Sequence, residues 1–102
     1  MHNRELEKLV LKITKSQDKL AFSKIFDYFA PRIISYLKSS GAHPEISEEI
    51  TQEVLSTVWQ KAYQFDHKIA NVSTWIFKIA RNKRIDRIRK EENPLYNTID
   101  LT

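Results

Sequence analysis

The residues best suited to bind a ligand are basic, and they gather in one short segment. Residues 75–90, WIFKIARNKRIDRIRK, hold seven Lys or Arg and one acid, Asp86, giving the segment a net charge of +6 against +4 for the whole chain. Cations at this density attract the phosphates of a nucleic acid, and a helix of this length spans about 24 Å, enough to meet several phosphates. The alternative is a solvated helix whose Lys and Arg stems cover apolar surface.

A second charged segment has the opposite sign, because residues 44–60 carry four Glu and no Lys or Arg. At about 100° per residue, the polar and apolar side chains of this segment fall on opposite arcs of a helix. The polar arc holds Glu45, Glu48, Glu49, Gln52, Glu53 and Ser56, and the apolar arc holds Ile46, Ile50, Val54, Leu55 and Val58. Ordinary solvent-facing arcs mix signs, since opposite charges at i,i+4 stabilise a helix. The arc therefore indicates a docking surface for a basic partner, with a solvated acidic surface as the alternative.

Aromatic and small polar side chains precede the basic segment. They are Trp59, Tyr63, Phe65 and Trp75, with Asn71, Ser73 and Thr74 between them. Rings beside a basic surface stack on unpaired bases, and each stacked base contributes about 1–3 kcal/mol. Trp59 and Trp75 are equally compatible with a place in the core, so both interpretations stay open.

Catalytic and metal chemistry have little support. His2, His43 and His67 lack ligand-like spacing, and the chain has no Cys. A single Gly excludes a glycine-rich phosphate loop, and no nucleophile–base arrangement stands out. We therefore expect no enzyme activity, no metal and no cofactor.

The composition bounds the class of protein. With 102 residues, 41% of them apolar and 29% charged, the chain is the size of one small globular domain. The longest run without a charged residue, Ile69 to Phe77, is far shorter than the roughly 20 residues of a membrane span. The N-terminus, MHNRELEKLVLK, carries charges where a signal peptide is apolar. We expect a cytoplasmic protein with no membrane partner.

The apolar spacing predicts helices throughout. A first helix covers 4–15, with Asn3 as its cap, and a second begins after Asp18. Pro31 is expected to kink or interrupt the second helix, and Gly41 to stop it.

The third helix is expected to start at Pro44 and to run to about Tyr63, followed by a loop over 65–72. Ser73 or Thr74 then caps the last helix. The prediction is an all-α fold, a small bundle of four to five helices, over residues 1–90. Residues 91–102, interrupted at Pro94, are expected to form a tail or the start of a linker.

Three blocks of the chain resemble region 2 of the sigma-70 family of bacterial transcription initiation factors, most of all its extracytoplasmic-function (ECF) group. They are AFSKIFDYFAPRIISYL, SEEITQEVLSTVWQKAYQFD and STWIFKIARNKRIDRIRK. The second is similar to the family's AED-LxQE-xFxxxW pattern, through Ser47-Glu48-Glu49 and Gln52-Glu53. The third is similar to WLxxIAxNxxxDxxR through Trp75, Ile76, Ile79, Ala80, Asn82, Asp86 and Arg89. The resemblance covers 18–90, and Thr51 departs from it at a position that is usually apolar.

The resemblance implies two partners. The acidic helix would dock on the β′ clamp helices of the RNA polymerase core through Glu48, Glu49, Gln52 and Glu53. The loop before Trp75 would take a flipped base of the minus-ten promoter element, and the basic helix would hold the non-template single strand. The implied DNA-binding residues are Lys61, Phe65, Asn71, Ser73, Thr74, Trp75, Lys78, Arg81, Asn82, Lys83 and Arg84. The resemblance also implies a monomer when free and leaves room for an anti-sigma factor.

Two other functions compete with this interpretation. A helix-turn-helix regulator of duplex DNA would use 75–90 as its recognition helix, but the short turn before that helix is missing and the acidic helix has no role. A helical protein-interaction module would use the basic residues only for solubility. Binding to single-stranded or duplex DNA separates the first two functions, and a lack of salt-dependent DNA binding favours the third.

Overall fold

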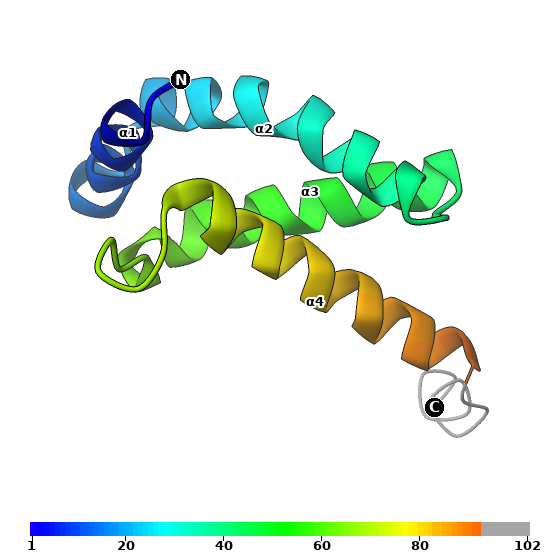
Figure 1. Cartoon of the computed structure of the whole chain (residues 1–102). Helices are drawn as coiled ribbons and strands as arrows, with labels where there is room; N and C mark the ends of the chain where they lie inside the picture. Colours follow the sequence, from blue (N-terminus) through cyan, green and yellow to red (C-terminus); the bar gives the residue numbers. More distant parts are fainter. Residues whose placement is uncertain (93–102) are drawn as a thin grey trace.

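The computed structural model describes residues 1–92, and the secondary structure in this range is entirely helical (Figure 1). The α-helices are α1 (Asn3–Ser16), α2 (Lys19–Ser39), α3 (Pro44–Lys61) and α4 (Val72–Glu92), and a short 3-10 helix, η1 (Ala62–Gln64), follows α3. The predicted all-α bundle is confirmed. Helix α4 continues past the expected boundary at Lys90, and the rest of the predicted tail or linker, 93–102, lies outside the described residues.

The core forms where α3 lies between α2 and α4, and α1 packs against α2 and η1 (Figure 1). In α2 an apolar side chain points inward at every fourth position, namely Ala21, Ile25, Phe29, Ile33 and Leu37. Helices α3 and α4 meet this row with Ile50, Val54, Leu55, Val58, Val72, Ile76 and Ala80, all buried. Full burial of a large aliphatic side chain contributes roughly 1.5–3 kcal/mol, so this packing decides which sides of α3 and α4 face solvent.

The boundaries of α2 follow from three residues. Asp18 caps the helix as predicted, because its Oδ1 accepts a hydrogen bond of 3.0 Å from the backbone N–H of Ala21. Pro31 lies inside α2 and does not interrupt it. A proline removes the N–H that would bond to the carbonyl of Asp27, and since both residues are exposed, water is free to take its place.

Gly41 stops α2, as predicted. Its φ of 102° lies in the left-handed region, and its N–H donates to the carbonyl of Lys38 at 3.0 Å. The N–H of Ala42 donates to the carbonyl of Leu37, also at 3.0 Å, which completes a Schellman motif. Helix α3 then begins at Pro44, the predicted first position.

Two predicted caps are wrong. Helix α1 begins at Asn3 itself, so that His2 is the N-cap, and in the described part of the chain no side chain caps this end. Helix α4 is capped by neither Ser73 nor Thr74, because it begins earlier, at Val72. Its capping side chain is Asn71, whose Oδ1 accepts a hydrogen bond of 2.7 Å from the N–H of Thr74.

Replacing Gly41 with Ala is expected to lower the free energy of unfolding by about 1–2 kcal/mol, because an L-residue is strained at this φ. A new Cβ would lie 3.6 Å from Nη2 of Arg84, an ordinary contact, so the loss comes from the backbone and not from crowding. Urea unfolding followed by circular dichroism measures it. Gly41→Asn is the control and should lose less, since Asn tolerates the left-handed region better. Equal stability of Gly41→Ala and the parent chain would contradict this account.

Candidate functional site

The predicted acidic arc exists as one exposed surface of α3. We call it the acidic face, and it consists of Glu45, Glu48, Glu49, Gln52, Glu53 and Ser56, all exposed. Ile50, Val54 and Val58 are fully buried on the opposite side of the helix. The described part of the chain gives Glu45 and Glu48 no ion pair. These two carboxylates are therefore available to a basic partner.

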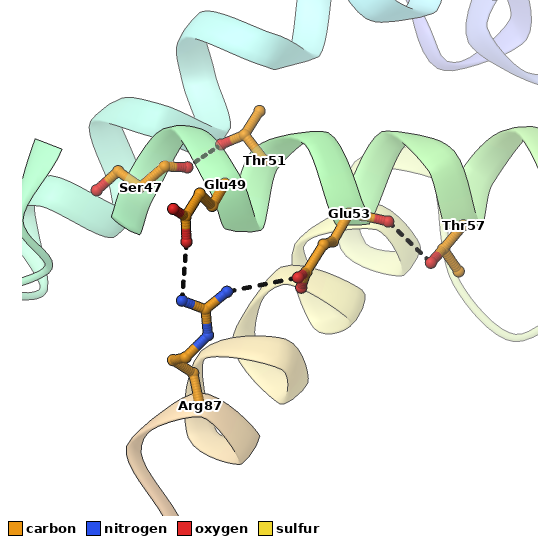
Figure 2. A network of polar contacts seen from close by, with 6 residues as sticks. All are labelled: Ser47, Glu49, Thr51, Glu53, Thr57 and Arg87. Carbon is orange, nitrogen blue, oxygen red and sulfur yellow. Dashed lines mark hydrogen bonds and ion pairs between the residues drawn. The ribbon is translucent and has the colours of Figure 1, made fainter. Parts of the chain in front are cut away.

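A basic side chain of α4, that of Arg87, reaches the edge of the acidic face (Figure 2). One guanidinium nitrogen of Arg87, Nη1, lies 3.0 Å from Oε2 of Glu49, and the other, Nη2, lies 3.4 Å from Oε1 of Glu53. The Arg87 side chain is 25% exposed, against 59% and 52% for the two glutamates. The hydrogen bond with Glu49, and the charges of Glu53 and Glu49, raise the pKa of Arg87 above its ordinary value, against the opposing effect of burial. The acidic face is thus partly neutralised by the protein itself.

Sequence reasoning missed this contact, although one signal pointed to it. Val72, Ile76 and Ala80 form the buried side of α4, and Lys83 and Arg87, three and seven residues after Ala80, prolong this side. Lys83 and Arg87 are both half-buried. A half-buried basic residue is stabilised by an acidic neighbour on the helix packed against it, and Arg87 has one, whereas the described residues give Lys83 no ion pair.

The interior beneath the acidic face contains two polar residues (Figure 2). Thr51 occupies a position that the family resemblance makes apolar, and it is buried, with its Oγ1 donating to the carbonyl of Ser47 at 2.7 Å. That bond satisfies the hydroxyl within its own helix and explains how a threonine is tolerated there. Within residues 1–92, the buried Oγ of Ser47 has no hydrogen-bond partner.

Four of the predicted DNA-binding residues line one groove. Ser73, Thr74, Lys78 and Arg81 of α4 meet Tyr36 of α2 and Phe77 of α4 around a volume of about 600 Å³. The rings of Tyr36 and Phe77 lie edge to face, with their centroids 5.5 Å apart. We call this the α4 groove. It combines cations, hydroxyls and aromatic rings, the groups that hold single-stranded nucleic acid. The sequence prediction included neither Tyr36, whose ring comes from a distant helix and leaves no local signal, nor Phe77, which lies in the basic segment itself.

Other predicted DNA-binding residues lie elsewhere. Arg84 is half-buried, and its Nη2 donates to the carbonyl of Ser40 at 2.7 Å, at the end of α2. This hydrogen bond gives the carbonyl of Ser40 a donor and places a cation at the negative end of the dipole of α2. Asn82 is exposed on α4, and Lys61 is exposed at the end of α3. The predicted set of DNA-binding residues therefore includes residues that line the α4 groove, a half-buried arginine at the end of α2, and exposed residues outside the groove.

The predicted aromatic residues form pairs and no single group. Phe65 and Trp75 pack with their centroids 5.6 Å apart, while Trp59 pairs with Phe22 of α2 at 5.1 Å. Trp59 and Trp75 are half-buried against the core, and Tyr63 is 66% exposed. Both tryptophans thus have a packing role, whereas the ring of Tyr63 is open to a ligand.

The loop before α4 covers 65–71, one residue shorter than predicted. Asp66 holds a tight turn, because its Oδ1 accepts from the N–H of Lys68 at 2.9 Å. Asn71 uses its Oδ1 for the cap of α4, so only its amide NH₂ group is left to contact a base. The connection between α3 and α4, 62–71, is longer than the turn of a helix-turn-helix motif, which disfavours that alternative.

Within residues 1–92, no group of His, Asp or Glu is arranged to hold a metal ion. Over the same range, none of the helices combines the length and the apolar character that crossing a membrane requires.

Comparison with known proteins places the chain in a family. The family model described as "Sigma-70 region 2" matches residues 25–93. The ECF RNA polymerase sigma factor RpoE of Cereibacter sphaeroides is 46% identical over 86 residues, which cover 84% of this chain and 48% of the relative. The ECF RNA polymerase sigma factor SigK of Mycobacterium tuberculosis (strain ATCC 25177 / H37Ra) is 28% identical over 83 residues, or 81% of this chain and 44% of the relative.

A solved structure is similar as well. Rhodobacter sphaeroides SigE, crystallised in complex with the anti-sigma ChrR, superposes with a TM-score of 0.78 at 43% identity, covering 82% of this chain and 54% of that one. The chain belongs to the sigma-70 region 2 family, whose members are transcription initiation factors and not enzymes. It spans about half the length of the curated relatives it matches.

Replacing Arg87 with Gln is expected to lower the free energy of unfolding by about 0.5–2 kcal/mol, since each partly exposed ion pair contributes roughly 0.2–1 kcal/mol. The loss should shrink as salt rises from 0.05 to about 1 M, because salt screens the pairs. Chemical unfolding at several salt concentrations measures it, with Arg89→Gln, at an exposed position on the same helix, as the control. Identical losses for both variants at every salt concentration would show that the pairs do not stabilise the bundle.

Proposed function

We propose that this domain binds the RNA polymerase core through the acidic face and holds the melted minus-ten promoter element through the α4 groove and the neighbouring loop. Membership of the sigma-70 region 2 family supports a role in transcription initiation. The observation that carries the proposal is the α4 groove, in which two cations, two hydroxyls and two rings meet along one exposed side of α4.

The chemistry of the α4 groove suits a single strand. Lys78 and Arg81 are exposed cations for the phosphates, and the rings of Tyr36 and Phe77 offer apolar surface to a base. Ser73 and Thr74 supply hydroxyls that donate and accept hydrogen bonds. A duplex conceals its base faces, so only a strand with unstacked bases uses all of these groups. Extruding a base costs unpairing energy, which makes melting depend on the promoter sequence.

The proposed DNA surface extends beyond the groove. It includes Lys61, Phe65, Asn71, Trp75, Asn82, Lys83 and Arg84 beside the four groove residues Ser73, Thr74, Lys78 and Arg81. The loop 65–71 takes the flipped base. Arg84 already donates one hydrogen bond to the carbonyl of Ser40 at the end of α2, so its charge and its other N–H groups serve the DNA.

The polymerase surface consists of Glu48, Glu49, Gln52 and Glu53. Complementary charge speeds the encounter of two proteins and sets their register, and this face offers carboxylates to basic residues of the β′ clamp helices. Glu48 and Gln52 are exposed, while Glu49 and Glu53 already share Arg87. Because the acidic face lies on α3 and the groove lies between α2 and α4, polymerase and DNA can bind at the same time.

The remaining partners follow from the same proposal. The domain acts as a monomer in the cytoplasm, where promoter DNA and polymerase are located, and it needs no cofactor. An anti-sigma protein is a further partner, since the related Rhodobacter sphaeroides SigE was crystallised in complex with the anti-sigma ChrR.

Single substitutions test the DNA surface. Lys78→Ala and Arg81→Ala should weaken binding to all minus-ten sequences alike, and each should lower the salt slope of binding by about 0.7. Asn82→Ala and Asn71→Ser should instead change the preference among sequences. Serine at position 71 keeps an oxygen for the cap of α4 and removes only the amide. Reconstituted holoenzyme on a panel of single-stranded minus-ten variants provides the measurement. The division into phosphate and base contacts is wrong if Lys78→Ala reorders the panel and the Asn variants do not.

A double substitution tests the polymerase surface. Glu48→Gln with Glu49→Gln removes two charges from the acidic face, and affinity for the β′ clamp helices should fall about tenfold, since charge pairs at an interface typically contribute about 1 kcal/mol or more. The matched control removes two exposed carboxylates elsewhere, Glu5→Gln with Asp27→Asn. Affinity is measured by titrating a β′ clamp-helix fragment, and circular dichroism checks the fold. Equal binding by the variant and its control would exclude the acidic face.

A further inference from the structure

The carboxylates of the acidic face differ in whether the domain already neutralises them. Glu45 and Glu48 have no ion pair within the described part of the chain. Glu49 and Glu53 instead share the guanidinium of Arg87, at 3.0 and 3.4 Å (Figure 2). Two of the four residues proposed for polymerase are therefore occupied by a cation of the same chain.

Arg87 has a further acidic neighbour on its own helix. Glu91 lies one turn further along α4, at i+4, where side chains on a helix are close enough to pair. Its side chain is exposed, and the described residues give it no ion pair. Arg87 and Glu91 also line one small cavity of about 140 Å³ beside the turn between α2 and α3, together with Gly41 and His43. The guanidinium thus has a second carboxylate within reach, and this carboxylate lies outside the acidic face.

A basic partner changes the balance between these two positions. The side chains of Glu49 and Glu53 are 59% and 52% exposed, so the cations of a partner reach them from solvent. The partner also covers the part of Arg87 that is still exposed. Cations that crowd the same two carboxylates repel one another, and burying a charge costs free energy unless it is paired. Moving the guanidinium to Glu91 removes both penalties.

We propose that Arg87 is a built-in competitor of polymerase, which occupies Glu49 and Glu53 in the free domain and moves to Glu91 when polymerase docks. The pairing lowers the affinity of the acidic face for every basic partner. It also makes the face selective, because a partner has to supply enough positive charge to displace a guanidinium that binds two carboxylates. The inference rests on the proposed function for the identity of the partner, whereas the contacts of Arg87 belong to the structure itself.

The competing role for Arg87 is to position the two carboxylates for polymerase. Each carboxylate has a second oxygen that Arg87 does not bind, and a partner that used these oxygens would leave Arg87 in place. The competitor role is favoured because the buried side of α3 already fixes where its glutamates lie, and a cation beside a carboxylate weakens its attraction for another cation. The two roles predict opposite effects of removing the guanidinium.

Arg87→Gln tests the competition. Titrating the N-terminally labelled chain with RNA polymerase core measures the affinity, and Arg89→Gln is the matched control, since it removes the same charge from an exposed position of α4. Arg87→Gln should bind about three- to tenfold more tightly than this control, the change that corresponds to two partly exposed ion pairs. Its affinity should also fall more steeply with salt, because in the parent chain salt weakens the competitor together with the partner. A variant that is less stable and yet binds more tightly is a result that a merely structural role of Arg87 does not produce.

Glu91→Gln tests the second position of the guanidinium. It should weaken binding to the core about two- to threefold more than Glu92→Gln, a change of the same charge at the next exposed position, because the displaced guanidinium loses its new partner. In an Arg87→Gln background the two glutamate variants should bind equally. Equal binding by both in the parent chain would overturn the move to Glu91.

The outcomes separate this inference from the function on which it rests. If Arg87→Gln binds as the control does or more weakly, while Glu48→Gln with Glu49→Gln still loses affinity, Arg87 is not a competitor and the proposed function stands. If neither the glutamate substitutions of α3 nor Arg87→Gln change the affinity for the core, polymerase does not use the acidic face, and the inference fails together with that part of the proposed function.

Discussion

The burial of one side of α3 is the constraint on which the rest of the domain depends. Ile50, Val54 and Val58 have no exposed surface, because α3 lies between α2 and α4 (Figure 1). Once this side faces inward, the 3.6-residue period of the helix forces the glutamates outward. A rotation of α3 by one residue, about 100°, would carry carboxylates into the core and expose the aliphatic side chains. The large free-energy difference between these arrangements explains why the acidic face is a fixed surface.

The two charged surfaces of the domain are physically connected. The inward-facing residues of α4 are apolar in its first half, namely Val72, Ile76 and Ala80. Further along the helix they are basic, namely Lys83 and Arg87. Two carboxylates of α3 offset the cost of partly burying the charge of Arg87 there. The same carboxylates belong to the surface that we propose for polymerase. A basic partner that docks on this face competes with a cation already present, and the net affinity is the difference between two similar interactions.

Local signals in the sequence predicted most of the helices. The features that the sequence did not predict depend mostly on contacts between segments that are distant in the chain. The cap at Asp18 and the stop at Gly41 depend on bonds within a few residues, so the residue types reveal them. The pairing of Arg87 with Glu49 joins positions 38 residues apart, and periodicity alone does not identify the partner. The α4 groove needed Tyr36 from another helix for the same reason. The cap of α4 was misassigned because Asn71, Ser73 and Thr74 are all good capping residues, and only the packing of Val72 sets where the helix starts.

Helix α4 is held to two different neighbours by two arginines three residues apart. Arg84 binds the end of α2 through Ser40, and Arg87 binds α3 through its glutamates. Two anchors to different neighbouring helices oppose rotation of the helix as well as sliding. Its exposed cations therefore lie at fixed separations along the helix axis, which the rise of 1.5 Å per residue sets. A flexible polymer that binds along these fixed cations becomes ordered, whereas the helix is ordered already. Most of the conformational entropy lost on binding is therefore lost by the polymer. A polymer that is already stiff would therefore lose less entropy, and bind more tightly, than a flexible one that makes the same contacts.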